Sequence, residues 1–212
     1  MQEPLLVIAT ANRGKFREFA DLFQDLPLRL RSLTGVRGVP VVTEDGTTYA
    51  DNALRKALTV ARWSGCAALA DDSGLEVDAL DAAPGVRSAR YAGPERDDRA
   101  NVAKLLAALH EIPAAGRTAR FRCVLAVASP DGGTWTVGGT CEGRIAEAPR
   151  GSGGFGYDRV FFYPPLGATL AEIPAAAKNA VSHRARACAT LRNNLLPFLA
   201  THAGACHGCR LD

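Results

Sequence analysis

The sequence lacks the features that mark several large classes of protein. No apolar run in its 212 residues approaches the ~18 residues that a membrane-spanning helix requires. The chain enters an apolar segment at Leu5 without the basic region and cleavage site of a secretory signal peptide. Its net charge of +3 is too small to indicate binding to nucleic acid. We therefore expect a protein of the cytoplasm that binds neither a membrane nor nucleic acid.

Internal repeats, low-complexity linkers and a complete zinc-binding pattern are missing as well. The segment Cys206-His207-Gly208-Cys209 has CxxC spacing. A zinc site needs about four ligands, and no second CxxC or histidine pair completes this one. A flexible tail over residues 201–212 is the favoured interpretation, with metal binding as the alternative. Four other cysteines stand singly in apolar contexts, which is typical of small core residues: Cys66, Cys123, Cys141 and Cys188.

Helical and strand-like patterns alternate along the chain. Apolar residues recur at helical spacing in four segments: residues 15–26, residues 51–63, residues 98–109, and a last helix from Ser182 that Pro197 should end or kink. Apolar runs or alternating patterns predict five strands: residues 5–9, 66–70, 120–128, 134–140 and 160–163. The turn Pro130-Asp131-Gly132-Gly133 predicts a hairpin between the third and fourth strands. The pattern predicts one α/β domain over residues 1–200, with a mixed sheet flanked by helices.

Two adjacent carboxylates, Asp71 and Asp72, follow the apolar run 66–70 and lead into Ser73-Gly74. That run has the length and composition of a buried strand, so we expect the pair where the strand leaves the core for a loop. In open α/β sheets this edge binds ligands. A divalent cation, or a proton to be taken up, would explain two carboxylates side by side. A plain turn is the alternative, because Asp, Ser and Gly all favour turns.

Two further polar segments lie at predicted joints and suit phosphate or metal. The segment Thr10-Ala11-Asn12-Arg13-Gly14-Lys15 joins a strand to a helix, whose first N–H groups favour phosphate. It lacks P-loop spacing, and an N-capped helix with a surface lysine is the alternative. The loop Glu44-Asp45-Gly46 precedes a helix on which Asn52 and Lys56 share a face. A solvated helix face is the alternative interpretation there.

The last two segments suit a nucleobase. Residues 150–158 contain four glycines, which let the backbone approach a ligand closely or adopt positive φ. Phe155 and Tyr157 in this segment could stack on a flat base. Ser182 is a candidate N-cap that places His183 and Arg184 at a helix start, where both can donate hydrogen bonds. A surface histidine and a solvated arginine are the alternatives. No residue pattern indicates a covalent nucleophile.

Together these segments resemble the inosine triphosphate pyrophosphatase family, which hydrolyses non-standard purine nucleoside triphosphates. The matching motifs occur in family order between about residues 5 and 196: Thr10 to Glu18, Glu44-Asp45-Gly46 with Asn52-Ala53 and Lys56-Ala57, Ala70 to Leu75, Pro84 to Tyr91, Gly153 to Asp158, and Ser182-His183-Arg184. The resemblance implies an elongated α/β fold with two lobes around a substrate cleft, and a homodimer. It also implies Mg²⁺-dependent hydrolysis of ITP, dITP and XTP to the monophosphate and pyrophosphate.

The resemblance also assigns roles to residues. Asp72 matches the family's proton acceptor and a metal ligand, and Glu44 matches a second metal-site carboxylate, with Asp71 and Asn52 in support. The matching substrate-binding positions are Thr10, Ala11, Asn12, Arg13, Gly14, Lys15, Lys56, Ser73, Phe155, Gly156, Tyr157, Asp158, Lys178, His183 and Arg184. Three departures matter: Asp51 stands where the family commonly has Glu, Arg159 replaces a usual proline near the base pocket, and the tail beyond about Pro197 has no counterpart in the family.

The mechanism expected from this inventory is attack of water on the α-phosphorus. Asp72 activates the water, Asp72 and Glu44 hold Mg²⁺, and lysines 15, 56 and 178 offset the charge of the leaving pyrophosphate. The like charge of Asp71 should raise the pKa of Asp72, an effect that bound Mg²⁺ opposes. Donors from His183, Arg184 or the backbone near Phe155 should select a purine 6-carbonyl over an amino group. Rival hypotheses are a pyrophosphatase of modified pyrimidine triphosphates and a nucleotide- or RNA-binding module without turnover.

Overall fold

The computed structural model describes residues 3–202, so most of the predicted tail, including Cys206 to Cys209, lies outside the described residues. The described chain divides into two compact units. Unit 1 comprises the described residues up to Asp72, Val124–Gly138, and the described residues from Ala187 onward. Unit 2 comprises Ser73–Cys123 and Gly139–Arg186. The boundary therefore falls between Asp72 and Ser73, inside the predicted acidic motif.

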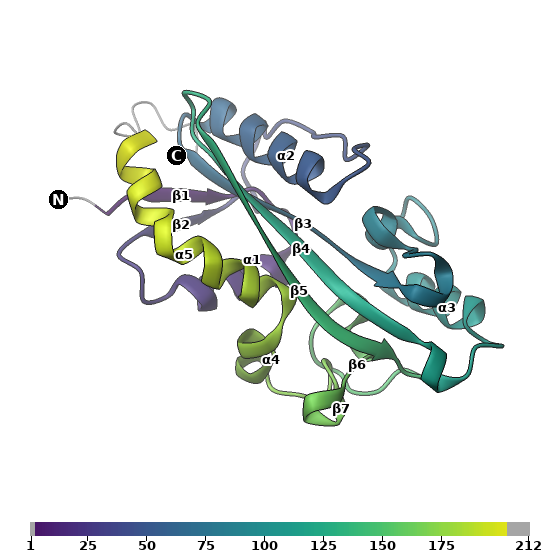
Figure 1. The fold of residues 1–212 in the computed structure, drawn as a ribbon. Coiled ribbons are helices and arrows are strands. Elements are labelled where there is room, and N and C mark those ends of the chain that lie inside the picture. The colour runs from purple at the N-terminus through teal and green to yellow at the C-terminus, as the bar shows by residue number, and fades with distance from the viewer. Residues whose placement is uncertain (1–2, 203–212) are drawn as a thin grey trace. The chain divides into compact units, whose positions relative to one another are not determined.

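A seven-stranded mixed sheet is formed by the described residues, in the strand order β2-β1-β3-β4-β5-β6-β7 (Figure 1). The strands are β1 Leu5–Ile8, β2 Arg29–Ser32, β3 Ala67–Val77, β4 Thr118–Ala128, β5 Thr134–Ile145, β6 Phe161–Tyr163 and β7 Ala168–Thr169. Strand β1 pairs in parallel with β2 and β3, whereas β6 pairs antiparallel with β5 and β7. The predicted mixed sheet flanked by helices is thus confirmed.

Unit 1 packs helices α1 (Arg13–Phe23) and α2 (Tyr49–Ser64) with β1 and the first part of β3. Alanines of α2, among them Ala53, Ala57 and Ala61, share one fully buried cluster with Ala68 and Ala70 of β3. Such small side chains let the backbone of a helix approach a strand closely. Thr48 is the N-cap of helix α2, and its Oγ1 accepts a hydrogen bond from Asp51 N (3.1 Å).

Unit 2 has its own core beneath helix α3 (Asp98–Ala108). Leu105 of α3 and Leu75 of β3 are fully buried in it, and the rings of Phe121 and Phe161 pack 4.5 Å apart. Helix α4 (Ala175–Val181) belongs to this unit, and the long helix α5 (His183–His202) starts in it. Ser182 Oγ accepts from Ala185 N (3.1 Å), which confirms the predicted N-cap.

The acid pair lies within a strand, so the prediction that it sits where a strand ends is wrong. Strand β3 continues through Asp71, Asp72 and Ser73 for eleven residues. Alternation resumes at Leu75 and Val77, both fully buried, and carries the strand past the turn-forming residues. Tertiary pairing has overridden the local turn preference of Asp-Asp-Ser-Gly.

Pro197 does not end the last helix. Helix α5 runs on to His202 with Pro197 inside it, because leucines on both sides of the proline, Leu195 and Leu199, remain packed in the core. Packing of this kind can outweigh the hydrogen bond that proline removes. Helix α4 and strands β2 and β7 were not predicted from the sequence; β2 carries the polar sequence Arg29-Leu30-Arg31-Ser32 at the edge of the sheet.

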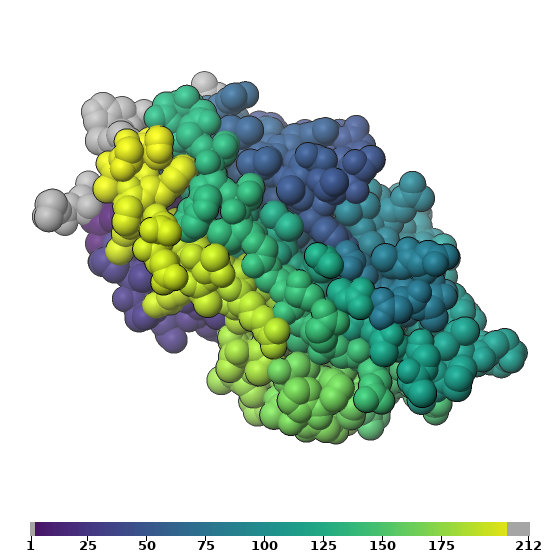
Figure 2. All heavy atoms as spheres, in the orientation of Figure 1, coloured from purple at the N-terminus to yellow at the C-terminus, as the bar shows by residue number. Residues whose placement is uncertain are grey.

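The predicted hairpin is confirmed between β4 and β5. Ser129 N donates to Gly133 O (2.9 Å) and Gly132 N to Ser129 O (3.1 Å). In Figure 2 the end of α5, in yellow, lies against the hairpin atoms, and His202 Nδ1 is 3.7 Å from Asp131 Oδ2. This contact places the hairpin of unit 1 beside the last described turn of α5.

The singly placed cysteines are core residues, as predicted. Cys123, Cys141 and Cys188 are buried free thiols, and burial raises the pKa of Cys141 to about 11. Cys66 is also buried but is disulfide-bonded, which corrects the expectation of a free thiol there. Among the described residues, no helix combines the length and apolarity needed to cross a bilayer.

Gly65 offers a test of how α2 is terminated. It caps the helix with φ +70°, and its N–H donates to Ala61 O (3.0 Å). We expect Gly65→Ala to lower the free energy of unfolding by about 1 kcal/mol, because alanine is strained in this left-handed conformation. Gly65→Asn is the matched control and should cost less, since asparagine tolerates that conformation. Urea unfolding measures both, and equal stability of the alanine variant and the wild type would contradict the prediction.

Candidate functional site

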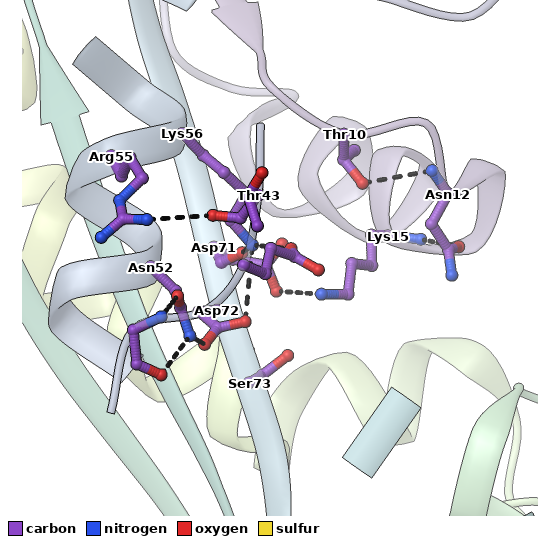
Figure 3. Close-up of polar contacts among 12 residues, drawn as sticks. Thr10, Asn12, Lys15, Thr43, Asn52, Arg55, Lys56, Asp71, Asp72 and Ser73 are labelled. Carbon is purple, nitrogen blue, oxygen red and sulfur yellow. Dashed lines mark hydrogen bonds and ion pairs between the residues drawn. The ribbon is translucent and has the colours of Figure 1, made fainter. Parts of the chain in front are cut away.

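The two carboxylates of the acid pair point to opposite faces of β3. Asp72 shares the face of Ala68 and Ala70, toward α2, because side chains alternate along a strand. Asp72 Oδ2 accepts from Asn52 Nδ2 of that helix (3.0 Å). Asp71 lies on the other face, where its Oδ2 is 2.9 Å from Lys15 Nζ of α1 (Figure 3). Both side chains are largely buried, at 1% and 12% exposure for Asp71 and Asp72.

Lys56 is the centre of the polar contacts on the α2 side. Its Nζ donates to Glu44 Oε1 (2.7 Å) and to the backbone oxygen of Asp71 (2.6 Å), and lies 3.4 Å from Asp72 Oδ1. Its side chain is only 12% exposed. One ammonium group therefore contacts two carboxylates from distant parts of the chain.

Asn52 fixes the loop that carries Glu44. Its Oδ1 accepts from Gly46 N (2.9 Å), while its Nδ2 holds Asp72. Gly46 is required at this contact, because a Cβ there would lie 2.7 Å from Asn52 Oδ1. Asn52 itself is 1% exposed. A buried amide thus links the acidic loop to the strand.

The segment from Thr10 to Lys15 forms an N-capped helix start. Asn12 Oδ1 accepts from Lys15 N (3.0 Å), and Asn12 N donates to Thr10 Oγ1 (3.2 Å). Ala11, Asn12 and Arg13 are exposed. Lys15 turns back onto Asp71 rather than into solvent, so the alternative of a surface lysine is wrong. The exposed first turn leaves helix N–H groups available to an anion.

Burial raises the pKa of Asp72 above its ordinary value. The ammonium of Lys56 and the hydrogen bond from Asn52 lower it, but they do not cancel the loss of solvation. Glu44 supplies the like charge that raises the pKa further, a role that the sequence had suggested for Asp71. Burial lowers the pKa of Lys56, but the surrounding carboxylates outweigh it, so that its pKa is raised and the lysine stays charged.

Glu44 and Asp72 fit a magnesium ion. Mg²⁺ prefers oxygen ligands, keeps several of its waters and is commonly held by one or two carboxylates with substrate phosphates. Both carboxylates contact Lys56 Nζ and therefore lie near each other. Within residues 3–202 no group of three or more His, Cys, Asp or Glu side chains is placed to hold a metal. A two-carboxylate site completed by water and phosphate is the arrangement that these residues allow.

A second polar group lies in unit 2, around Asp158. Its Oδ2 accepts from Lys178 Nζ (2.6 Å) and from Phe155 N (2.9 Å), and both members of the ion pair are nearly inaccessible to solvent. Lys178 Nζ lies 4.6 Å from the centre of the Phe155 ring. Arg184, 1% exposed, donates to Ser73 Oγ (3.1 Å). The alternative of a solvated arginine is therefore wrong, because Arg184 is a buried cation beside the same aromatic ring, 6.0 Å from its centre.

Two predicted base-binding residues have buried side chains. The Tyr157 ring is buried in the core, and its hydroxyl donates to Ser88 O (2.9 Å). Burial raises the pKa of that hydroxyl, and the ring is not available to stack on a ligand. His183 stacks on Phe121 with the rings 4.7 Å apart and is 5% exposed, so the alternative of a surface histidine is also wrong. Phe155, half-buried, is the aromatic of this segment that remains partly accessible.

The predicted site residues fall into one group in each unit. Unit 1 holds the group suited to metal and phosphate: Thr10, Ala11, Asn12, Arg13, Gly14, Lys15, Glu44, Asn52, Lys56, Asp71 and Asp72. Unit 2 holds the group suited to a base: Ser73, Phe155, Gly156, Tyr157, Asp158, Lys178, His183 and Arg184. Sequence reasoning missed Asp98, whose Oδ2 accepts from Gly156 N (2.8 Å). Asp98 carried only the signal of an acidic helix start, with nothing to link it to a loop far along the chain.

Comparison with known proteins decides the family. The model of the Ham1 family matches residues 6–194 of the chain. The chain belongs to this family. The resemblance on which the sequence analysis rested is thereby confirmed. Family membership extends over both units, since the matched residues include both groups of site residues.

Ham1-family relatives resemble the chain over nearly its whole length. A protein of Geobacter sulfurreducens named dITP/XTP pyrophosphatase is 54% identical over 90% of this chain and 96% of its own. Its namesake in Geobacillus kaustophilus is 52% identical over 88% and 91%. Among solved structures, a HAM1 protein from Coxiella burnetii is 39% identical with a TM-score of 0.82, covering 92% of this chain and 99% of that one.

A Mycobacterium abscessus structure carries a more explicit description. It is described as a nucleoside-triphosphatase, dITP/XTP pyrophosphatase, and is 43% identical with a TM-score of 0.71. It covers 88% of this chain and 98% of its own. The fold of this Ham1-family member is thus shared with solved relatives at substantial sequence identity.

We expect Asp72→Asn to leave the metal-free protein at least as stable as the wild type at pH 7. Because the folded-state pKa of Asp72 is raised above its unfolded value, this group stabilises the fold fully below the unfolded pKa. That contribution is lost as the pH rises through the folded pKa. The neutral amide has no such loss, so the difference should shrink as the pH falls toward about 4. Urea unfolding in EDTA between pH 4 and 8 measures it; a variant clearly less stable at pH 7 would show the expectation to be wrong.

Proposed function

We propose that the protein hydrolyses dITP and XTP between the α- and β-phosphates, releasing the nucleoside monophosphate and pyrophosphate in the presence of Mg²⁺. Relatives that carry this name are about half identical over nine-tenths of the chain, and this supports a nucleoside triphosphate pyrophosphatase. The observation that carries the proposal is the buried Asp72, held by Asn52 and placed beside the lysine that also binds Glu44. Removal of non-standard purine triphosphates from the nucleotide pool is the corresponding biological function.

Unit 1 handles the triphosphate in this proposal. Glu44 and Asp72 would hold Mg²⁺, which when bound would neutralise phosphate charge and lower the pKa of bound water. Lys15 and Lys56 add positive charge, and the exposed first turn of α1 offers N–H groups to phosphate oxygens. Both lysines are already held by carboxylates in the cluster, so little ordering is left to substrate binding.

Asp72 serves as the proton acceptor for the attacking water. A carboxylate whose pKa is raised by burial is a stronger base than an exposed one, and proton transfer is most efficient when the pKa approaches the working pH. The hydrogen bond from Asn52 fixes Oδ2, and Asp71 remains with Lys15 on the other face of the strand. Asp71 therefore acts by holding Lys15.

Unit 2 recognises the base in this proposal. Phe155 supplies a flat apolar surface, and Lys178 and Arg184 are cations beside its ring. Donors favour the 6-carbonyl of hypoxanthine and xanthine, whereas the 6-amino group of adenine would leave a buried donor unpaired. His183 and Tyr157 support this group through packing. Rejection of GTP requires hindrance at its 2-amino group.

The assembly and location implied by the family resemblance belong to the same proposal. We expect a homodimer in the cytoplasm that acts on free nucleotides and does not bind nucleic acid. Exposed apolar side chains of large size are few among the described residues, namely Val41 and Leu166, and they do not define a dimer surface. Sedimentation measurements test the dimer directly.

Release of pyrophosphate from dITP is the decisive assay. The wild type should be active with Mg²⁺ and inactive after EDTA, and Asp72→Asn should lose about 10²–10⁴-fold in kcat because the proton acceptor is gone. Asp45→Asn is the matched control: Asp45 is an exposed carboxylate of the same loop that pairs with Arg55, and its loss should leave turnover nearly unchanged. Near-wild-type turnover by Asp72→Asn would refute the role of Asp72, and binding without turnover in the wild type would favour the binding-module hypothesis.

A panel of triphosphates tests the base assignment. We expect kcat/KM for dITP and XTP to exceed that for dATP and dGTP by roughly a hundredfold or more, because the 6-amino group of dATP leaves a buried donor unpaired and the 2-amino group of dGTP is hindered. Modified pyrimidine triphosphates belong in the same panel, as the rival substrate class. Comparable hydrolysis of dATP, or a preference for a pyrimidine, would overturn the assignment while leaving pyrophosphatase activity intact.

A further inference from the structure

Phe155 stands between two backbone positions that only glycine adopts readily. We call residues Gly151 to Asp158 the glycine loop. Gly154 has φ +68° and Gly156 has φ +59°, both in the left-handed region. A Cβ at Gly154 would collide with the Asp158 carboxylate, whereas one at Gly156 would meet no atom within 4 Å. The loop therefore turns sharply on each side of Phe155, and its ring direction depends on how those two peptide groups are held.

Both peptide groups around Phe155 donate to a carboxylate. Phe155 N donates to Asp158 Oδ2 (2.9 Å), within the loop. Gly156 N donates to Asp98 Oδ2 (2.8 Å), on helix α3. The first bond fixes the peptide before Phe155 and the second fixes the peptide after it. Asp98, which is distant in sequence, thus holds one of the two peptide groups that flank Phe155.

Helix α3 is itself anchored on the same side. Asn101, one turn beyond Asp98 and 2% exposed, donates to Ala89 O (3.1 Å) and accepts from Ala92 N (2.6 Å). Lys104, one turn further, donates to Tyr91 O (2.7 Å). Three residues at helical spacing therefore tie α3 to backbone groups of unit 2. Asp98 accordingly projects from a firmly held helix.

Apolar packing joins the end of the glycine loop to α3, because Tyr157 shares a buried core cluster with Val102 and Leu105. A pocket of about 370 Å³ lies between them, lined by Val102 and Leu106 of the helix and by Phe155 and Gly156 of the loop. The hydrogen bond from Gly156 N to Asp98 Oδ2 (2.8 Å) is a further attachment, at the residue next to Phe155.

We propose that Asp98 is a positioning residue for Phe155, acting through the Gly156 N–H and thereby setting base discrimination. The proposal rests on the proposed function in one respect only, the assignment of Phe155 to the base. Asp98 belongs to unit 2, whereas the Asp72 cluster belongs to unit 1. Loss of Asp98 should consequently affect base binding and selectivity far more than the chemical step.

Kinetics of matched variants test the proposal. We expect Asp98→Ala to raise the KM for dITP about fivefold to tenfold, the effect of one hydrogen bond of ordinary strength, with kcat changed by less than about twofold. The ratio of kcat/KM for dITP to that for dATP should fall by a similar factor. Asp98→Asn keeps an acceptor oxygen at the same place and should restore most of both quantities.

Asp97→Ala is the control for a merely structural effect. Asp97 caps α3 by accepting from Arg99 N (2.8 Å) and does not touch the glycine loop. Its loss should lower the melting temperature and leave KM and discrimination unchanged. If Asp97→Ala raises KM as much as Asp98→Ala, or if Asp98→Asn is as impaired as Asp98→Ala, the positioning role is overturned.

Amide hydrogen exchange separates this proposal from the proposed function. Asp98→Ala should speed exchange of the peptide containing Gly156 at least about tenfold in the absence of any nucleotide, while peptides of β3 exchange as in the wild type. Unchanged exchange at Gly156 would refute the attachment even if the enzyme is active. Faster exchange in a protein that fails to hydrolyse dITP would support the attachment and refute only the assigned substrate.

Discussion

The charge of Lys56 is the constraint on which the group proposed to bind metal and phosphate depends. A buried ammonium must be paired to be tolerated, and here two carboxylates and a backbone oxygen surround it. The same requirement brings Glu44, from an irregular loop, to Asp72, in the middle of a strand. Even without metal, Lys56 thus holds the two carboxylates near each other against their mutual repulsion. Substrate and Mg²⁺ would enter a cluster whose electrostatic balance is already established.

The group of polar residues around Asp158 in unit 2 is also held together by charge pairing, here by a single ion pair. Asp158 and Lys178 are both almost completely buried, and the carboxylate's remaining capacity is used by the N–H of Phe155. Gly154 must lack a side chain because the carboxylate occupies the space where a Cβ would be. One buried ion pair therefore decides the shape of the loop, the identity of a glycine and the position of an aromatic ring. Charge pairing in both units places functional groups, in addition to any contribution to stability.

Much of the site was predictable because its residues occur in short motifs with definite chemistry. Asn52 and Lys56 share a helix face by spacing alone, and Asn12 and Ser182 cap helices as their side chains indicate. Local preference misled where tertiary packing decided. The turn formers after Asp72 continue a long strand, Pro197 stays inside a helix, and Tyr157 is a core residue. The contact of Asp98 could not be predicted, because a side chain that binds the backbone of a distant loop leaves no pattern in the sequence.

The close packing of alanines between helix α2 and strand β3 has a consequence for natural sequence variants. Ala53, Ala57 and Ala61 have no exposed surface, and they separate the helix bearing Asn52 and Lys56 from the strand bearing Asp72. Adding even two methyl groups there would have to push the helix outward, since protein interiors have few empty spaces. Lys56 and Asn52 would move with it. Substitution of these alanines by larger apolar residues would therefore reduce the activity of the enzyme by degrees, from positions that do not contact a nucleotide.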